Sequence, residues 1–302
     1  MTPGSFFFPR TKPVMTKHIL IQLDSDTQPS SFDSVVAIDA GVDQLLRYSQ
    51  VEVDGVVPLV HGAMFTRGGD DLRHTAIFIG GSNVARAEEL LAACQGAFFG
   101  PVRVSLMLDA NGCNTTAAAA VVAAGRHVPI RGAKAVVLGG TGPVGRRVAQ
   151  LLASDGADVR LVSRSLERAT QACGEIVHKV GEASIEPASV ADGEQTVAEL
   201  VRDAEIVIGC GAAGAELVDQ DTILSIPKLK VAIDLNAVPP AGIGGIEVTD
   251  KAKNLGAGVA YGAIGVGGLK MKTHKAAIKS LFESNDRLLD AEEIYAIAKA
   301  IG

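Results

Sequence analysis

Hydrophobic and polar positions alternate in blocks from residue 17 onward, in a rhythm typical of repeated strand–helix units. In the first part of the chain, apolar residues at helical spacing predict a helix over 32–48. Asn83 suits the N-cap of a helix that continues to Cys94, and another helix is predicted over 115–124. Short apolar runs predict strands at 18–23, 51–60, 75–79 and 102–108.

A second series of strands and helices follows a short linker at 128–132. The predicted strands cover 134–138, 158–163, 205–209 and 231–235. The predicted helices cover 143–154, 166–178 and 195–202. Because alternating strands and helices build parallel sheets covered on both faces, we expect two α/β domains. The second is predicted to be a Rossmann-type parallel sheet, with the active-site cleft between the two domains.

The C-terminal segment predicts a pair of helices. The first covers 267–283, and the second begins with a capping-box pattern at Asp290 and Glu293 and runs to Ile301. Since the Rossmann unit is complete without these helices, we expect them to pack against the first domain.

The domain boundaries follow from this reading. We expect a substrate domain of 17–127 together with 268–302, and a nucleotide-binding domain of 128–267. Residues 1–16 are expected to form a flexible extension, and Met15 is an alternative start of translation.

Charge and composition narrow the range of partners. The net charge is −6, and only 4% of residues are aromatic, which excludes a basic or stacking surface for nucleic acid. The apolar run Phe6–Phe8 is too short for a signal sequence or a membrane span. None of the four cysteines forms a CxxC pair, so we expect a cytoplasmic protein without a metal site.

A glycine-rich turn carries the strongest chemical signal. Gly140, Gly142 and Gly145 form a G-x-G-x-x-G pattern between an apolar strand and a helix. The first glycine is expected to allow the turn, the second to let the backbone approach a pyrophosphate, and the third to let the helix pack closely. The predicted cofactor contacts here are Gly140, Thr141, Gly142, Pro143, Val144 and Gly145.

The end of the next strand favours NADP(H) over NAD(H). An NAD-binding domain usually has an acidic residue there, but this chain has Ser163, Arg164 and Ser165, with Arg168 one turn later. Arg164 is able to pair with the adenosine 2′-phosphate, and the serines to donate hydrogen bonds to it. A solvated arginine is the alternative, and NAD remains a weaker second cofactor.

Two later strand ends face the same crevice. Small residues follow the third predicted strand of this domain, where Gly211, Ala212 and Ala213 leave room for a cofactor. Asn236 follows the fourth strand, near the expected nicotinamide position. Cys210 is interpreted as a small buried thiol rather than a nucleophile.

Polar residues also gather at strand ends of the first domain, where ligands of open α/β sheets bind. Helix capping is the alternative role for several of them, Asp33 and Thr115 in particular. The candidate substrate-binding residues are Asp24, Asp26, Phe32, Asp33, Asp109, Asn111, Asn114 and Thr115.

Several long motifs point to one family. They include FTRGG at 65–69, GGTGPVG at 139–145, DLNAVPPAGIGGIE at 234–247 and YGAIGVGGLKMKTHK at 261–275. Together they resemble the NADP-dependent methylene-tetrahydromethanopterin / methylene-tetrahydrofolate dehydrogenases of methylotrophic bacteria. The resemblance covers about residues 17–301.

The resemblance implies oxidation of a methylene group between two pterin nitrogens, with hydride transfer to NADP⁺. The reduced pterin is the implied substrate, and the step requires neither a general base nor a metal. Lys270 matches the lysine that the family places in the cleft, which implies that it orients the pterin. The preceding glycines favour a place in the cleft over a helix surface. His274 is expected either to line the cleft or to be structural.

The sequence leaves some alternatives open. The preferred pterin is not determined, and the resemblance implies a homo-oligomer, with a trimer suggested. A shikimate-type dehydrogenase would require a catalytic lysine in the first domain, yet residues 17–125 contain none beyond Lys17. A non-catalytic NADPH-sensing protein would require neither Lys270 nor the polar residues at 109–116.

Overall fold

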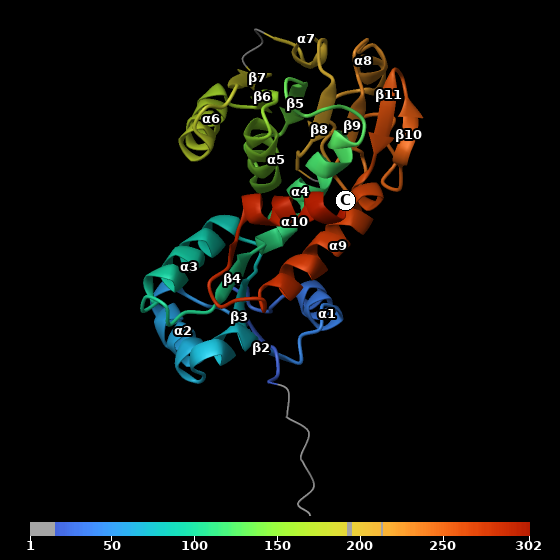
Figure 1. Ribbon diagram of the computed structural model, residues 1–302. Helices are drawn as coiled ribbons and strands as arrows, with labels where there is room; N and C mark the ends of the chain where they lie inside the picture. Colours follow the sequence, from blue (N-terminus) through green and yellow to red (C-terminus); the bar gives the residue numbers. More distant parts are fainter. Residues whose placement is uncertain (1–15, 192–194, 213) are drawn as a thin grey trace, which may run out of the picture.

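The computed structural model describes residues 16–191, 195–212 and 214–302, which form two sheets flanked by helices (Figure 1). The described strands form a five-stranded and a seven-stranded sheet, which are parallel except for one antiparallel edge pair. The predicted α/β fold with a Rossmann-type second sheet is therefore confirmed. The expected extension at 1–16 lies outside the described residues except for Thr16.

The first sheet has the strand order β12-β4-β3-β1-β2. Its strands are β1 (Ile19–Leu23), β2 (Gln44–Tyr48), β3 (Thr75–Ile79), β4 (Ser105–Leu108) and β12 (Leu288–Leu289). Its helices are α1 (Ser31–Asp39), α2 (Val56–Phe65), α3 (Val84–Gly96) and α4 (Cys113–Gly125). As predicted, Asn83 caps α3, because its side chain accepts a hydrogen bond from the Arg86 amide.

The single helix predicted over 32–48 is wrong. Helix α1 ends at Asp39, and Gly41 then adopts a φ of +93°, which is outside helical geometry. Residues 44–48 form the edge strand β2, whose residues are mostly exposed. The apolar residues of this strand happen to continue the helical spacing of α1, so the pattern hides the turn.

The strand predicted over 51–60 is also wrong. The segment contains a short 3-10 turn at Val53–Gly55 and then begins α2. The buried residues Val56, Val60 and Met64 lie four positions apart, which is helical spacing. That period becomes visible only when the apolar run is followed as far as residue 65.

The second sheet has the order β10-β11-β9-β8-β5-β6-β7, which contains the strand order of dinucleotide-binding sheets with β5 as first strand. Four of its strands were predicted: β5 (Lys134–Leu138), β6 (Asp158–Ser163), β8 (Ile206–Gly209) and β9 (Val231–Asp234). The others are β7 (Ile185–Ser189), β10 (Lys251–Leu255) and β11 (Gly258–Tyr261). The edge strands β7 and β10 are largely exposed and lack an apolar run, so the sequence pattern missed them.

The helices of the second sheet follow the predicted order. They are α5 (Pro143–Ser154), α6 (Leu166–Val180), α7 (Val197–Val201) and the unpredicted short α8 (Gln220–Leu224). Helix α6 begins at the N-cap Ser165 and ends where Gly181 adopts a φ of +81°.

The C-terminal helices return to the centre of the molecule. Helix α9 (Ala263–Ser280) packs against α1 and α4, and α10 (Ala291–Ile301) packs against α4 and α9. Helix α9 begins before the predicted start at 267, so Gly267 and Gly268 are helical and do not form a turn before Lys270. The predicted capping box of Asp290 and Glu293 is present at the start of α10.

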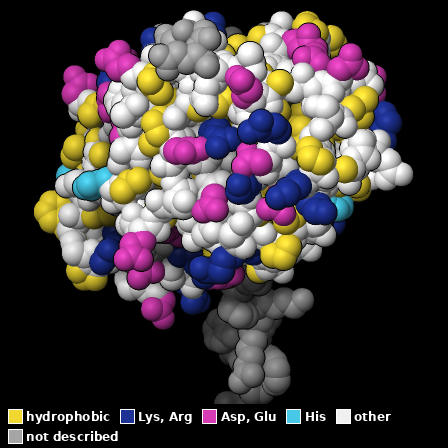
Figure 2. Space-filling model, turned by 90° about the horizontal axis from the view of Figure 1, so that it is seen from above, with side chains coloured by type: hydrophobic (Ala, Val, Ile, Leu, Met, Phe, Trp, Pro, Cys, Tyr) yellow, Lys and Arg dark blue, Asp and Glu magenta, His cyan; other side chains and the backbone are white. Residues whose placement is uncertain are grey.

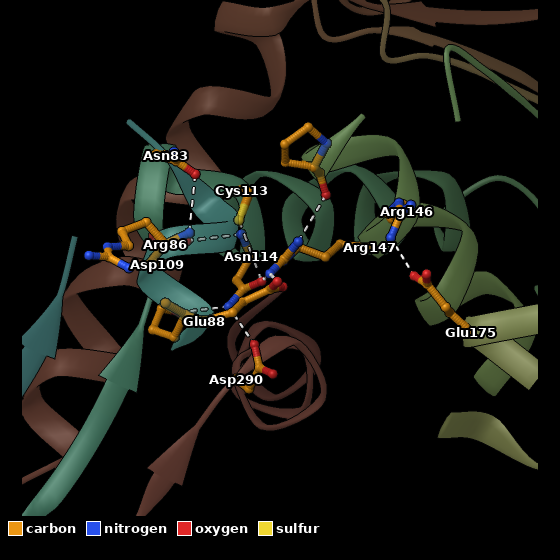
Figure 3. A network of polar contacts seen from close by, with 12 residues as sticks. Asn83, Arg86, Glu88, Asp109, Cys113, Asn114, Arg146, Arg147, Glu175 and Asp290 are labelled. Atoms are coloured by element: carbon orange, nitrogen blue, oxygen red, sulfur yellow. Dashed lines mark hydrogen bonds and ion pairs between the residues drawn. The ribbon is translucent and has the colours of Figure 1, made fainter. Parts of the chain in front are cut away.

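A buried polar network joins the helices between the two sheets (Figure 3). The Asn114 side chain on α4 donates to the Leu108 carbonyl at 2.6 Å and to the Asp290 carboxylate at 2.9 Å, and accepts from Arg147. Arg147 on α5 also donates to the Pro143 carbonyl at 3.2 Å and pairs with Glu88 at 2.8 Å. The network therefore places the N-terminal turns of α4 and α5 side by side.

Basic and acidic side chains are interspersed on the face shown in Figure 2, consistent with the low net charge. Across the described residues, no helix is long and apolar enough to cross a membrane. The same part of the chain contains no group of three His, Cys, Asp or Glu residues arranged to hold a metal ion.

Candidate functional site

The glycine-rich loop connects β5 to α5, and the chain turns at Gly139. This residue has a φ of +71°, and a Cβ there would lie 2.8 Å from the Gly211 backbone. The predicted turn residue, Gly140, has no positive φ, but a Cβ there would lie 2.6 Å from the Leu161 side chain. The turn therefore depends on Gly139, and Gly140 serves close packing against β6.

The next two glycines differ in what surrounds them. A Cβ at Gly145 would lie 2.6 Å from the Gly139 carbonyl oxygen, so this glycine permits the contact between α5 and the loop. A Cβ at Gly142 would have its nearest protein neighbour, Gly139 O, at 3.6 Å, so the protein itself does not require a glycine. Pro143 follows as the first residue of α5, with Val144 after it. The open position at Gly142 and the free amides of this helix end suit an anionic ligand.

The end of β6 lies beside this loop. Ser163 is buried, and its hydroxyl lies 3.2 Å from that of Thr141. Ser165 caps α6 by accepting a hydrogen bond from the Arg168 amide at 3.3 Å. Arg164 between the serines is exposed, and Arg168 on the first turn of α6 is exposed as well. The two arginines are therefore accessible to a ligand, while Ser165 is occupied with capping.

The loop after β9 is held by a residue that sequence reasoning did not select. Asp234 is buried and accepts hydrogen bonds from the amides of Asn236, Gly242 and Ile243 at 3.1, 2.7 and 3.2 Å. Burial raises the pKa of this carboxyl, whereas these amides oppose the shift. The predicted cofactor residue Asn236 binds its own loop, through the Pro240 carbonyl and the Val238 amide. The sequence signal that could have identified Asp234 is an acidic residue at the end of an apolar strand.

The small residues after β8 are only partly described. Gly211 lies under the glycine-rich turn, where a Cβ would meet the Leu217 side chain at 2.7 Å. Ala212 is exposed, and Ala213 lies outside the described residues. Burial raises the pKa of the Cys210 thiol, in line with its interpretation as an unreactive group.

Five candidate residues on three separate segments line one pocket of about 330 Å³ at the carboxyl ends of β1, β3 and β4. They are Asp26, Phe32, Asp33, Asn111 and Lys270. Sequence reasoning did not select the remaining lining residues, which are mostly small or uncharged and carry no distinctive signal. These are Gln28, Ser30, Gly81, Ser82 and Gly112.

The pocket rests on two fully buried carboxylates. Asp24 accepts hydrogen bonds from the amides of Asp26 and Ser30, at 2.9 and 3.3 Å. Asp109 accepts from the amides of Asn114 and Thr115 at 2.9 and 3.0 Å, and from the Thr115 hydroxyl at 2.7 Å. Burial raises the pKa of both carboxyls, and the Lys270 charge opposes this rise at Asp109.

Asp26 and Asp33 are the carboxylates at the pocket itself. Asp26 is held by the Ser82 amide and hydroxyl, each at 2.9 Å. The Asp33 amide is bonded to the Ser30 hydroxyl at the start of α1, so the capping role expected for this region belongs to Ser30. Burial raises the pKa of the Asp33 carboxyl.

Lys270 lies on the second turn of α9 and points over the pocket. Its Nζ is 3.4 Å from the Gly112 carbonyl oxygen and 5.7 Å from the centre of the Phe32 ring. Gly112 has a φ of +59°, and a Cβ there would overlap the Lys270 ammonium. Phe32 is 50% exposed, which leaves an aromatic face beside the cation.

Four of the proposed substrate contacts do not line the pocket: Asp24, Asp109, Asn114 and Thr115. Asn114 and Thr115 are fully buried, and their side chains bind protein groups. Asn114 belongs to the network between the sheets, and Thr115 supports Asp109. Both residues are therefore structural supports of the pocket floor, because their polar atoms are already engaged at the start of α4.

The chain is similar in sequence to proteins of one family. Residues 31–111 match the family model described as methylene-tetrahydromethanopterin dehydrogenase, N-terminal. The chain is 48% identical over 289 residues to the bifunctional protein MdtA of Methylorubrum extorquens, covering 94% of this chain and 99% of that protein. It is 34% identical to the NAD(P)-dependent methylenetetrahydromethanopterin dehydrogenase of the same organism, covering 95% and 99%. The chain belongs to the methylene-tetrahydromethanopterin dehydrogenase family.

The fold of this family member is also similar to that of shikimate 5-dehydrogenase from Listeria monocytogenes, whose structure was determined with shikimate and NAD. The TM-score is 0.54 at 14% identity, and the match covers 95% of this chain and 98% of the other. At that identity, the similarity shows a shared two-sheet fold.

The glycine geometry of this dehydrogenase-family chain predicts effects of different size on stability for two alanine substitutions. Gly145→Ala is expected to lower the free energy of unfolding by about 1–3 kcal/mol, because its Cβ would overlap the loop backbone. Gly142→Ala is expected to change it by less than about 1 kcal/mol, because no protein atom is displaced. Urea unfolding of both variants measures the difference. Equal stability of the two variants would contradict the packing role of Gly145.

Proposed function

We propose that this protein oxidises methylene-tetrahydromethanopterin to the methenyl form by hydride transfer to NADP⁺. The observation that carries the proposal is the pocket in which Lys270 and Phe32 meet two carboxylates, Asp26 and Asp33. Sequence similarity also supports the proposal, because one relative of this chain is named NAD(P)-dependent methylenetetrahydromethanopterin dehydrogenase. Methylene-tetrahydrofolate is a second candidate substrate, since it has the same reacting ring.

The residues around the glycine-rich loop fit a dinucleotide. Gly142 leaves open the space that a Cβ would fill, and the adjacent α5 N-terminus offers amide donors to a pyrophosphate. Arg164 and Arg168 are exposed beside the same loop and would bind a 2′-phosphate. NADP⁺ supplies a hydride acceptor when bound. NAD⁺ is the weaker second cofactor in this proposal.

The residues of the pocket suit a reaction that creates positive charge. Removal of hydride from the methylene carbon leaves a cation spread over two nitrogens, so no proton has to be removed in that step. The Asp33 carboxyl lies at the pocket and the Asp109 carboxyl is buried beneath it, and the Lys270 charge favours the ionised form of both. Because a cation does not stabilise a developing cation, Lys270 serves to place the substrate rather than to balance charge.

Further proposals concern the organisation of the protein. We propose the two domains with the bounds given above, a cytoplasmic location, and a homo-oligomer that is a trimer. Large apolar side chains exposed on α1 and β2 support self-association: Val35, Ile38 and Leu46 are 62%, 54% and 44% exposed.

The proposed function is tested by following absorbance of NADPH with purified protein. Methylene-tetrahydromethanopterin, methylene-tetrahydrofolate and shikimate are compared, each with NADP⁺ and with NAD⁺. We expect turnover with a methylene pterin and NADP⁺, and none with shikimate. Turnover of neither pterin would refute the proposal, and NADPH binding without any turnover would favour the sensing protein.

Arg164 is predicted to set the cofactor preference. Arg164→Ala is expected to raise the KM for NADP⁺ by about 10- to 100-fold, because a charge-assisted bond to the 2′-phosphate is lost. The KM for NAD⁺ should remain within about twofold, since NAD⁺ lacks that phosphate. Arg202→Ala removes an exposed arginine beyond α7 and serves as the control. An equal rise in the KM for NADP⁺ and in the KM for NAD⁺ would argue against phosphate recognition by Arg164.

Lys270 is predicted to place the pterin. Lys270→Ala should lower turnover by at least about 100-fold, because hydride transfer requires close alignment of donor and acceptor. The Kd for NADP⁺ should stay unchanged in a fluorescence titration. Lys272→Ala, on the exposed side of the same helix, is the matched control and should retain wild-type turnover. Full activity of the Lys270→Ala variant would show that Lys270 does not place the substrate.

A further inference from the structure

His274 is a buried imidazole that packing does not explain. It lies one turn after Lys270 on α9 and is fully buried. Its ring stacks against Phe78, with 5.7 Å between centroids, and is tilted against Phe32 at 6.4 Å. Among the described residues, neither of its ring nitrogens has a hydrogen-bond partner. Since buried polar groups are costly without partners, a phenylalanine would fill this aromatic space at lower cost.

Two carboxylates flank the imidazole. His274 Nδ1 lies 3.9 Å from Asp109 Oδ2, and the charge of Asp33 favours the protonated ring. Burial nevertheless lowers the pKa of His274 to about 4, so the ring is neutral at pH 7 and has one N–H to donate. A separation of 3.9 Å exceeds a hydrogen bond, but such contacts in a site without ligand often shorten when substrate binds.

Asp109 has room for one more donor on the side of His274. Its Oδ1 accepts two backbone amides, whereas its Oδ2 accepts only the Thr115 hydroxyl. The other titratable groups that face Asp109 are Lys270 on α9, Asp33 on α1 and Cys113 on α4. Lys270 is the only cation among these described groups, and it also faces the pocket.

We propose that His274 is a positioning residue for the pterin site: its Nδ1–H donates to Asp109 Oδ2 when substrate is bound. The inference rests on the proposed function, because the substrate is what draws the Lys270 ammonium from Asp109 toward the pocket. The donor on His274 then keeps the buried Asp109 carboxylate ionised. The negative charge beneath the pocket persists while the substrate becomes a cation.

A phenylalanine substitution separates this role from a structural one. His274→Phe keeps the aromatic packing, so the thermal unfolding midpoint is expected to stay unchanged or rise, and the Kd for NADP⁺ to stay unchanged. The kcat is expected to fall by at least about tenfold, the effect of losing a hydrogen bond to a charged group. Loss of that donor also raises the pKa of Asp109, so the acid limb of the kcat–pH profile should move to higher pH.

A second substitution tests whether the donor itself matters. His274→Asn retains an amide N–H near Asp109, and it should restore part of the kcat and return the acid limb toward the wild-type position. An unchanged kcat and pH profile in His274→Phe would overturn the proposal. Equal losses in both variants, with no displacement of the acid limb, would likewise show that His274 acts only through packing.

The tautomer of His274 tests the proposal without turnover. In protein labelled with ¹⁵N-histidine, the signal absent from His274→Phe identifies the ring. We expect Nδ1–H in the unliganded wild type, whereas Nε2–H would overturn the inference. If the wild type oxidises neither methylene pterin, the proposed function fails, and the tautomer still decides the assignment of His274 as a donor to Asp109.

Discussion

Asp109 ends β4 with a carboxylate that is fully buried, and three donors from the first turn of α4 hold it there. This arrangement requires the chain to turn sharply between β4 and α4. Asn111 and Gly112 make the turn with φ values of +52° and +59°. The turn directs the Gly112 carbonyl toward Lys270, so the carboxylate in the core determines the shape of the pocket edge above it.

Helix α4 transmits this constraint to the rest of the molecule. Its buried alanines, which include Ala117, Ala118 and Ala120, allow α5, α9 and α10 to pack close around it. Asn114 at its start joins Arg147 of α5 and Asp290 of α10, as Figure 3 shows. The glycine-rich loop and the pocket therefore share one rigid support. A proposed hydride transfer between the two would benefit from that support, because it depends on a fixed separation.

The sequence pattern predicted the strands whose residues are almost all buried, and it missed strands whose residues are only partly buried. The largely buried strands β3, β5 and β8 were found from their apolar runs, and their neighbours followed from glycine and capping signals. The exposed edge strands β2 and β7 escaped because a half-solvated strand needs no continuous apolar run. For the site, the residue types were identifiable, but not their partners. The sequence suggested that Asn114 and Thr115 contact the substrate, whereas in the structure their buried side chains support the floor of the pocket.

The sequence alone determined the glycine-rich loop between β5 and α5, because the strand, glycines and helix that form it are consecutive, and local geometry suffices to build it. It also identified the acidic and aromatic residues after β1 and the lysine on the C-terminal helix. Only the tertiary structure decided that Phe32 and Lys270 meet over one pocket, and that His274 lies beside Asp109. These contacts join segments more than 150 residues apart, and they arise from the packing of α9 against α1 and α4, which no local pattern encodes.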